Sequence, residues 1–256
     1  MLWLLAQIHQ AHASPLVVQT IGEAFDQNSN KLLYSETHCV SQDALTREVL
    51  YRNTEEQLIA YKVLRYDSGP MTPSLEQRNL YSNAIVAIEW QRGTILVTAG
   101  ENIADGKTRS VSLLPRAESP VVIDAGFDAL VTENWDSLLD GVGKRFQFPV
   151  AALEAIMELR IESAPCSYDT QTDQCFTLEV DNWLISMVVD ATELGYNSQL
   201  RRLTRFRGVS NISDGSGTSL VVDIHYRYQD LAALQCTKNT AGEVSITGGK
   251  NVWQSP

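Results

Sequence analysis

Four arginines that lie close together are the most suggestive candidate binding residues in this chain of 256 residues. In an extended strand, Arg201, Arg205 and Arg207 would share one face, while Arg202 would take the other. Three guanidinium groups on one face could hold a phosphate, a carboxylate or another anionic head group. The alternative is a solvated strand face, balanced by some of the 31 acidic residues. The polar loop 208–217 follows and offers a surface for a protein partner.

Aromatic side chains form the second candidate group. They fall on the expected inward faces of strands and helices: Trp90, Phe127, Trp135, Phe146, Phe148 and Trp183. Filling of the hydrophobic core is the simplest role for such residues. If the sheet curls and helices cover its opening, the same residues would instead line a cavity for an acyl chain or another apolar ligand.

The common signatures of catalysis and of metal binding are absent from the sequence. There is no G-x-S-x-G motif and no P-loop. Only His38 and His225 lie beyond the N-terminal segment, and nothing in the sequence places either beside a serine and an acid. Asn211 and Asp214 provide too few ligands for a calcium loop. We therefore expect no metal and no cofactor, and a hydrolase is only a third hypothesis.

The four cysteines predict disulfide bonds. Cys166 and Cys175 flank a polar turn between two strand-like segments, so a disulfide there would close a hairpin. By elimination Cys39 would pair with Cys236, although four cysteines allow three pairings. A zinc site is the weaker alternative, because the spacing of Cys166 and Cys175 does not suit zinc and no histidine is near.

The N-terminal segment and the overall charge indicate an exported protein. Residues 1–13 are uncharged and end in Ala-His-Ala, which fits a signal-peptide cleavage site; an ordinary helix or strand is the alternative. The net charge of −11 argues against nucleic-acid binding. No apolar run of about 18 residues occurs, so we expect no integral membrane segment in the mature form. A periplasmic or secreted location is predicted.

Strand patterns dominate the chain. Runs such as 31–39, 45–53 and 57–66 are joined by short polar turns, as in an antiparallel meander, and 194–228 reads as the closing unit. We expect about 10–12 strands in one antiparallel sheet, and a sheet of that size must curl or split. A half-barrel or barrel-like sheet is favoured over a sandwich. Residues 14–228 would form one domain, with 229–256 as an irregular tail; a division near 115–123 is the alternative.

One segment has a helical period. Apolar residues from Asp124 to Leu139 follow the spacing of an amphipathic helix, with Asp124 as its N-cap and Gly141 or Gly143 at its end. Its apolar stripe is broad and includes aromatic residues, so we expect it to cover the concave face of the sheet. Residues 181–189 could form a second short helix or continue the preceding strand.

Three segments carry a resemblance to other proteins. They are DAGFDALVTENWDSLL (124–139), KRFQFPV (144–150) and the run 180–215 that begins VDNWLISMVVD. With them the chain resembles uncharacterised exported proteins of Gram-negative bacteria, over most of residues 22–228. The expected architecture is also loosely similar to periplasmic lipoprotein carriers of the half-barrel type, an analogy at the level of the fold.

Together these features favour a periplasmic, non-enzymatic protein that binds an apolar or amphipathic ligand, such as a lipid or a lipoprotein acyl chain. The alternative is an interaction module of the cell envelope, which would dock a protein partner through the arginine face and the loop 208–217.

Overall fold

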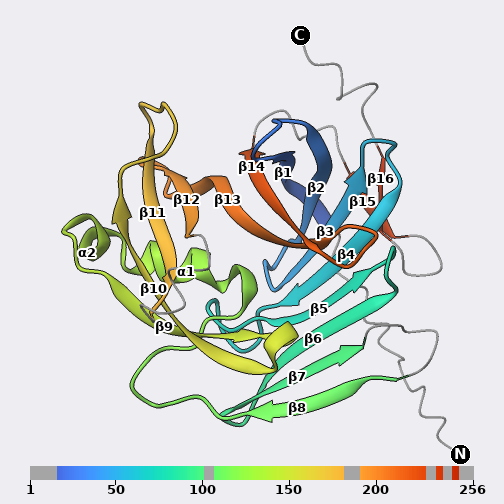
Figure 1. Ribbon diagram of the computed structural model, residues 1–256, viewed down its shortest axis with the longest axis horizontal. Coiled ribbons are helices and arrows are strands. Elements are labelled where there is room, and N and C mark those ends of the chain that lie inside the picture. Colours follow the sequence, from blue (N-terminus) through green and yellow to red (C-terminus); the bar gives the residue numbers. More distant parts are fainter. Residues whose placement is uncertain (1–15, 101–106, 182–190, 229–234, 239–243, 248–256) are drawn as a thin grey trace, which may run out of the picture.

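One curled antiparallel sheet makes up most of the protein (Figure 1). The computed structural model describes residues 16–100, 107–181, 191–228, 235–238 and 244–247. Its strands are β1 (Leu16–Asp26), β2 (Leu32–Ser41), β3 (Thr46–Asn53), β4 (Leu58–Arg65), β5 (Ser74–Asn79), β6 (Ala84–Gln91), β7 (Thr94–Gly100), β8 (Arg109–Leu113), β9 (Lys144–Val150), β10 (Ala155–Ala164), β11 (Asp173–Val180), β12 (Thr192–Asn197), β13 (Arg202–Ser213), β14 (Ser219–Arg227), β15 (Gln235–Lys238) and β16 (Val244–Thr247). The predicted fold class, a mainly β protein with a single curled sheet, is confirmed.

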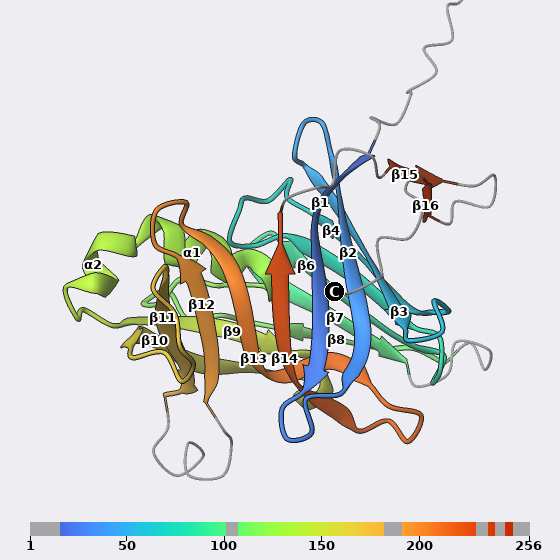
Figure 2. The same cartoon turned by 90° about the horizontal axis from the view of Figure 1, so that it is seen from above.

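The sheet consists of two antiparallel meanders, in which the first strand of one meander pairs with the last strand of the other. From one edge to the other it runs β8 to β1 in descending order, then β14 to β9. The join is the antiparallel pair of β1 and β14, in which Gly22 lies opposite Tyr226. β15 pairs with β1 and with β16, and these two short strands lie on the side of the sheet away from the helices (Figure 2).

The sheet has more strands than the sequence predicts. It contains 16 strands in the described part of the chain. Two prolines and a glycine in residues 67–79 indicate a loop, yet β5 occupies the second half of this stretch, and its polar residues Gln77 and Asn79 are buried. The prediction of an irregular tail after residue 228 is wrong for β15 and β16.

A connecting segment, rather than strand pairing, spans the gap between the edge strands β8 and β9. Gln147 of β9 donates its backbone N–H to the carbonyl of Pro120 and accepts one from Val122. Its side-chain amide donates to the carbonyls of Arg116 and Ser119. The sheet is therefore not closed by pairing of β8 with β9. Instead, residues 116–122 lie along the free edge of β9.

A helical plug (residues 124–139) begins inside the curl and extends to its margin, at the far left of Figure 1. It consists of the 3-10 turn η2 (Asp124–Gly126) and the helices α1 (Phe127–Glu133) and α2 (Trp135–Leu139), which Asn134 separates. The predicted helix is thus present but interrupted. Asp124 is not its N-cap, because this residue has a left-handed backbone with φ of 44°. Gly141, with φ of 79°, ends the plug as expected.

The plug packs tightly on the sheet. Leu130, Val131 and Trp135 share a buried cluster with residues of β9 to β13, including Phe146 and Phe176. At the start of the plug, a Cβ atom on Gly126 would lie 2.1 Å from the carbonyl oxygen of Met71. Only glycine permits this approach of η2 to the β4–β5 connection.

Both predicted disulfides are present. Cys166 pairs with Cys175, and Cys39 of β2 pairs with Cys236 of β15. The second bond joins positions 197 residues apart and fixes part of the C-terminal tail to the outer face of the sheet. Residues 1–13, which were predicted to be a signal peptide, and nearly all of the possible helix 181–189 lie outside the described residues.

Candidate functional site

A small cavity, called here the mouth cavity, opens where one end of β1–β4 meets α1. Its volume is about 210 Å³. The lining residues come from the strand ends, the adjoining turns and the plug: Gln19, Val40, Ala44, Arg47, Tyr66, Pro70, Ala125, Asp128 and Ala129. Most of this wall is apolar, and it carries one cationic and one acidic side chain. Such a combination is typical of sites for small amphipathic ligands.

Arg47 provides the cation. It lies directly opposite Val40 in the pair of β2 and β3, and its guanidinium carbon is 5.9 Å from the centroid of the Tyr66 ring. The Nε atom of Arg47 is buried and has no hydrogen-bond partner. Buried donors of this kind are rare in native proteins, so Arg47 has unused binding capacity beside the cavity.

Asp128 provides the acid from the first turn of α1. Its Oδ1 atom accepts a hydrogen bond of 2.7 Å from the hydroxyl of Tyr196. Burial raises the pKa of Asp128, while the Tyr196 hydrogen bond and the charge of Arg47 act to lower it. The carboxyl group is therefore held in a fixed orientation and is easier to protonate than an exposed aspartate.

Further polar residues are buried on the same concave face. On β2, the Nε2 atom of His38 lies 3.0 Å from Oε2 of Glu36, which also accepts a hydrogen bond of 3.1 Å from Tyr226. Burial lowers the pKa of His38, although Glu36 acts to raise it, so the ring is mostly neutral at pH 7. Its Nδ1 atom has no partner.

These groups do not form a hydrolytic triad. Ser210, the buried serine of the concave face, shares a hydrogen bond of 2.7 Å with Tyr34 rather than with His38. His225, on the other face, lies 3.2 Å from Asp223 and is half exposed. Within the described part of the chain, neither histidine is hydrogen-bonded to a hydroxyl group that could act as a nucleophile. Within the described residues there is also no cluster of side chains that could hold a metal ion.

A buried ion pair holds the plug next to the mouth cavity. The ammonium group of Lys62, on β4, donates to both oxygens of Asp124 at 2.8 and 3.2 Å. The side chains are only 9% and 17% exposed. This pair joins the sheet to η2 immediately before the three cavity-lining residues of the plug, Ala125, Asp128 and Ala129.

The predicted aromatic residues lie in the packed core. Trp135 meets the rings of Phe176 and Tyr196 edge-on, at centroid distances of 5.4 and 6.1 Å. Phe127, Phe146 and Phe148 belong to the same cluster, and Trp90 belongs to another beside β6–β8. These five line neither described cavity. Their packing favours the core-filling alternative, and Trp183 lies outside the described residues.

The arginine cluster is divided between different places. Arg201 lies in a turn, where it pairs with Asp136 at 3.0 Å. Arg205 and Arg207 alternate with the core residue Phe206, so they point to the outer face of β13. The expectation that all three arginines share one face is therefore wrong, because β13 begins only after Arg201.

Asp223 pairs with both outer arginines. It accepts two hydrogen bonds from Arg205, at 2.7 and 2.6 Å, and lies 3.3 Å from Arg207. Arg205 also stacks on Tyr168, with its guanidinium carbon 3.9 Å from the ring centroid. Asp223 balances one of the two guanidinium charges, and Glu193 of β12 lies directly opposite Arg207, so the arrangement matches the charge-balanced alternative.

Asp223 is expected to add a pH-dependent part to the stability. Burial alone would favour its neutral form, but Arg205 and His225 hold its pKa well below the ordinary value of 3.8. Because the folded pKa is depressed, this contribution is present above about pH 4 and is lost as the pH falls further. We expect Asp223→Asn to lower the free energy of unfolding at pH 7 by about 2 kcal/mol.

Urea unfolding of both proteins between pH 7 and pH 2 tests this prediction. The difference between wild type and variant should shrink below about pH 4. A difference that stays constant over the whole range would contradict the assignment.

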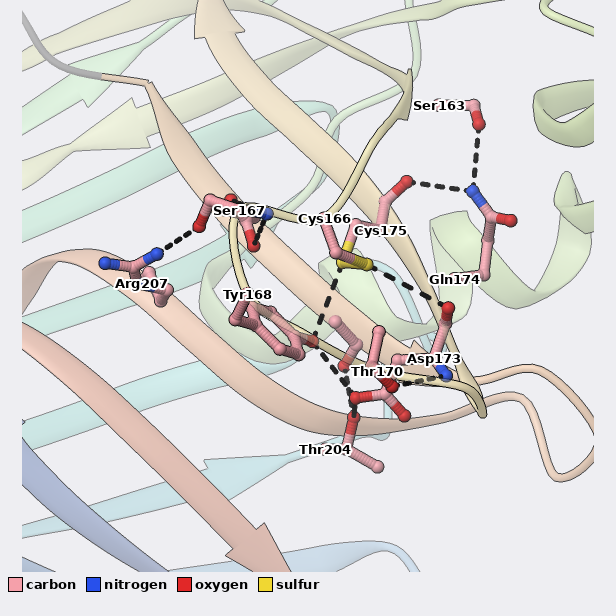
Figure 3. Close-up of a disulfide and its surroundings, with 12 residues drawn as sticks. Ser163, Cys166, Ser167, Tyr168, Thr170, Asp173, Gln174, Cys175, Thr204 and Arg207 are labelled. Carbon is pink, nitrogen blue, oxygen red and sulfur yellow. Dashed lines mark hydrogen bonds between the residues drawn. A yellow bond between two sulfur atoms is a disulfide. The ribbon is translucent and has the colours of Figure 1, made fainter.

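A second hollow, of about 340 Å³, lies beside the Cys166–Cys175 disulfide. Its polar groups bond to one another (Figure 3). Asp173 accepts hydrogen bonds from Tyr168 at 3.0 Å and from Thr204 at 2.9 Å, and Gln174 donates to Ser163 at 2.9 Å. These bonds hold the hairpin loop in place, so the mouth cavity is the stronger candidate for ligand binding.

The fold and its bonds define a class of protein: an open antiparallel half-barrel with an internal helical plug and two disulfides. No protein-family model matches the chain, and no curated protein matches it significantly. Among solved structures, it is similar to a beta-barrel-like protein of the domain of unknown function DUF1849 from Brucella abortus. The identity is 6% and the TM-score 0.43, over 84% of this chain and 96% of the other.

Proposed function

We propose that this protein is a non-enzymatic binding protein of the periplasm, and that an amphipathic ligand occupies the mouth cavity. One observation carries the proposal: an apolar cavity holds two charged side chains in fixed positions, Arg47 beside Tyr66 and Asp128 bonded to Tyr196. Ligand sites commonly combine apolar walls with a few such orienting groups.

The two disulfides support an oxidising compartment. Both cysteine pairs are bonded, and such bonds persist mainly outside the cytosol. Among the described helices, none is long and apolar enough to cross a membrane.

The size of the cavity limits the ligand. Its volume of about 210 Å³ is smaller than the range of about 300–1,000 Å³ that is common for drug-sized ligands. A short apolar group fits this space. A long acyl chain would have to displace the plug, whose buried side chains pack against β9 to β13.

Filling the cavity tests the proposal. In Ala129→Trp the indole would occupy the mouth cavity, and Ala117→Trp, at an exposed position, is the matched control. Native mass spectrometry and solvent extraction of protein purified from the periplasm should find a small amphipathic compound in wild type and in the control, but not in Ala129→Trp. Equal occupancy of all three proteins would place the ligand elsewhere. Thermal unfolding curves show whether both variants are folded.

A cell-envelope interaction module is the second candidate. Val209 and Val221 lie opposite each other on β13 and β14 and are 50% and 43% exposed, next to the exposed turn 214–218. This apolar pair, rather than the ion-paired arginines, is where a protein partner would dock. Loss of a crosslinked partner in Val209→Asp, with ligand binding intact, would favour this candidate.

A further inference from the structure

We infer that the ligand of the mouth cavity carries a single carboxylate, which Arg47 binds, and that a short hydrocarbon group of the ligand packs on Val40, Pro70 and Ala129. This inference rests on the proposed function and assigns the chemical class of the ligand. Its starting point is the guanidinium group of Arg47, which lines the cavity and whose Nε–H has no acceptor among the described residues.

The shape and position of Arg47 suit a carboxylate. A guanidinium group presents parallel N–H donors that match the two oxygens of a carboxylate, whereas a lysine offers a point charge. The Tyr66 ring lies 5.9 Å from the guanidinium carbon and limits the positions that the side chain can adopt. A carboxylate in the cavity would therefore meet a donor that is already oriented.

The other charged groups around the cavity limit the charge of the ligand. Lys62 pairs with the nearby acid Asp124, whereas Glu36 faces the mostly neutral ring of His38. Asp128 lines the cavity itself, and one of its oxygens is occupied by Tyr196. When Asp128 is ionised, it repels a dianion about twice as strongly as a monoanion, so a carboxylate fits better than a doubly charged phosphate.

The apolar wall defines the rest of the ligand. Val40 lies directly across from Arg47, and Ala129 follows Asp128 on the plug, so apolar surface adjoins both charged groups. The small volume leaves space for a short chain beside the carboxylate. A short-chain or medium-chain monocarboxylic acid has this combination of one charge and one apolar end.

Three probes of equal chain length test the inference: hexanoate, hexanol and hexyl phosphate, each titrated calorimetrically into the folded, disulfide-bonded protein. We expect hexanoate to bind at least about tenfold more tightly than hexanol, since hydrogen bonds to charged groups are the stronger ones. Hexyl phosphate, measured at pH 8 where it is a dianion, should bind more weakly than hexanoate.

Variants separate the carboxylate contact from the cavity itself. Arg47→Gln should weaken hexanoate binding by about tenfold or more and leave hexanol binding unchanged. Arg47→Lys should give an intermediate loss, because it keeps the charge without the paired donors. Arg52→Gln, at the other end of the same strand, is the control and should bind like wild type.

The results distinguish failure of the carboxylate assignment from failure of the cavity as the binding site. Binding of hexanoate that Ala129→Trp abolishes but Arg47→Gln leaves intact would overturn the carboxylate assignment and keep the cavity as the binding site. Tighter, Arg47-dependent binding of hexyl phosphate would replace the carboxylate by a phosphate. If none of the three probes binds at millimolar concentration, both the proposed site and the inference fail.

Discussion

Replacing Cys39 and Cys236 together by serine is expected to lower the free energy of unfolding by about 5 kcal/mol. This disulfide closes a loop across 197 residues of sequence, so its loss frees nearly the whole unfolded chain. The chain-entropy cost of closing a loop increases with its length, which makes this bond the more stabilising of the two. Guanidinium unfolding of the oxidised wild type and of the double variant measures the difference.

The second disulfide provides the matched control. Cys166 and Cys175 are only 9 residues apart, and the same relation gives about 3 kcal/mol for the variant with serine at both positions. The order of the two variants in free energy of unfolding is a sharper test than either value alone. If the Cys166/Cys175 variant is the less stable, local packing of the hairpin loop outweighs chain entropy.

Replacing Lys62 by methionine is expected to cost about 3–5 kcal/mol, because it leaves the buried carboxylate of Asp124 without its cation. The ion pair is short, with 2.8 Å between Lys62 Nζ and Asp124 Oδ1, and both groups are largely removed from solvent. Urea unfolding of wild type and variant measures this cost. Hydrogen exchange in α1 should accelerate as well, because Asp124 belongs to the plug.

A second substitution isolates the ion pair from simple loss of packing. Adding Asp124→Asn to Lys62→Met removes the unpaired charge, and the asparagine oxygen can still accept the hydrogen bond that Asp124 takes from the N–H of Ala125. We expect the double variant to be more stable than Lys62→Met alone. Lys31→Met, at an exposed position, should have little effect. A double variant less stable than Lys62→Met would refute the charge-based explanation.

The sequence predicts the strands where apolar and polar residues alternate and the turns are polar. β14 is an example, in which Val222, Ile224 and Tyr226 face the core while Asp223 and His225 face outward. The plug is equally clear, because Leu130, Val131 and Leu138 follow a helical period. β5 does not show this alternation of apolar and polar residues, because its inward residues are partly polar. A sequence pattern cannot distinguish a buried amide side chain from one in a loop.

The candidate site was missed for a related reason. Arg47 shares one strand face with Val49 and Tyr51, which are buried, and His38 shares another with Tyr34. A charged or titratable residue on an otherwise apolar face is a signal for an interior site that the sequence does contain. The arginines at 201–207 are more conspicuous in the sequence. Only the folded chain shows that Asp223 lies opposite Arg207 and forms ion pairs with both Arg205 and Arg207.

Because β1 pairs with β14, the sheet cannot be completed until β14 has been synthesised. The hydroxyl of Thr20 donates to the carbonyl of Arg227, a contact across 207 positions of sequence. β1 is synthesised before β14, so one of its two edges stays unpaired until β14 has been made. Non-local closure of this kind is slow, and an unpaired apolar strand invites aggregation in the meantime. A nascent chain of this protein therefore needs protection until β14 has been made.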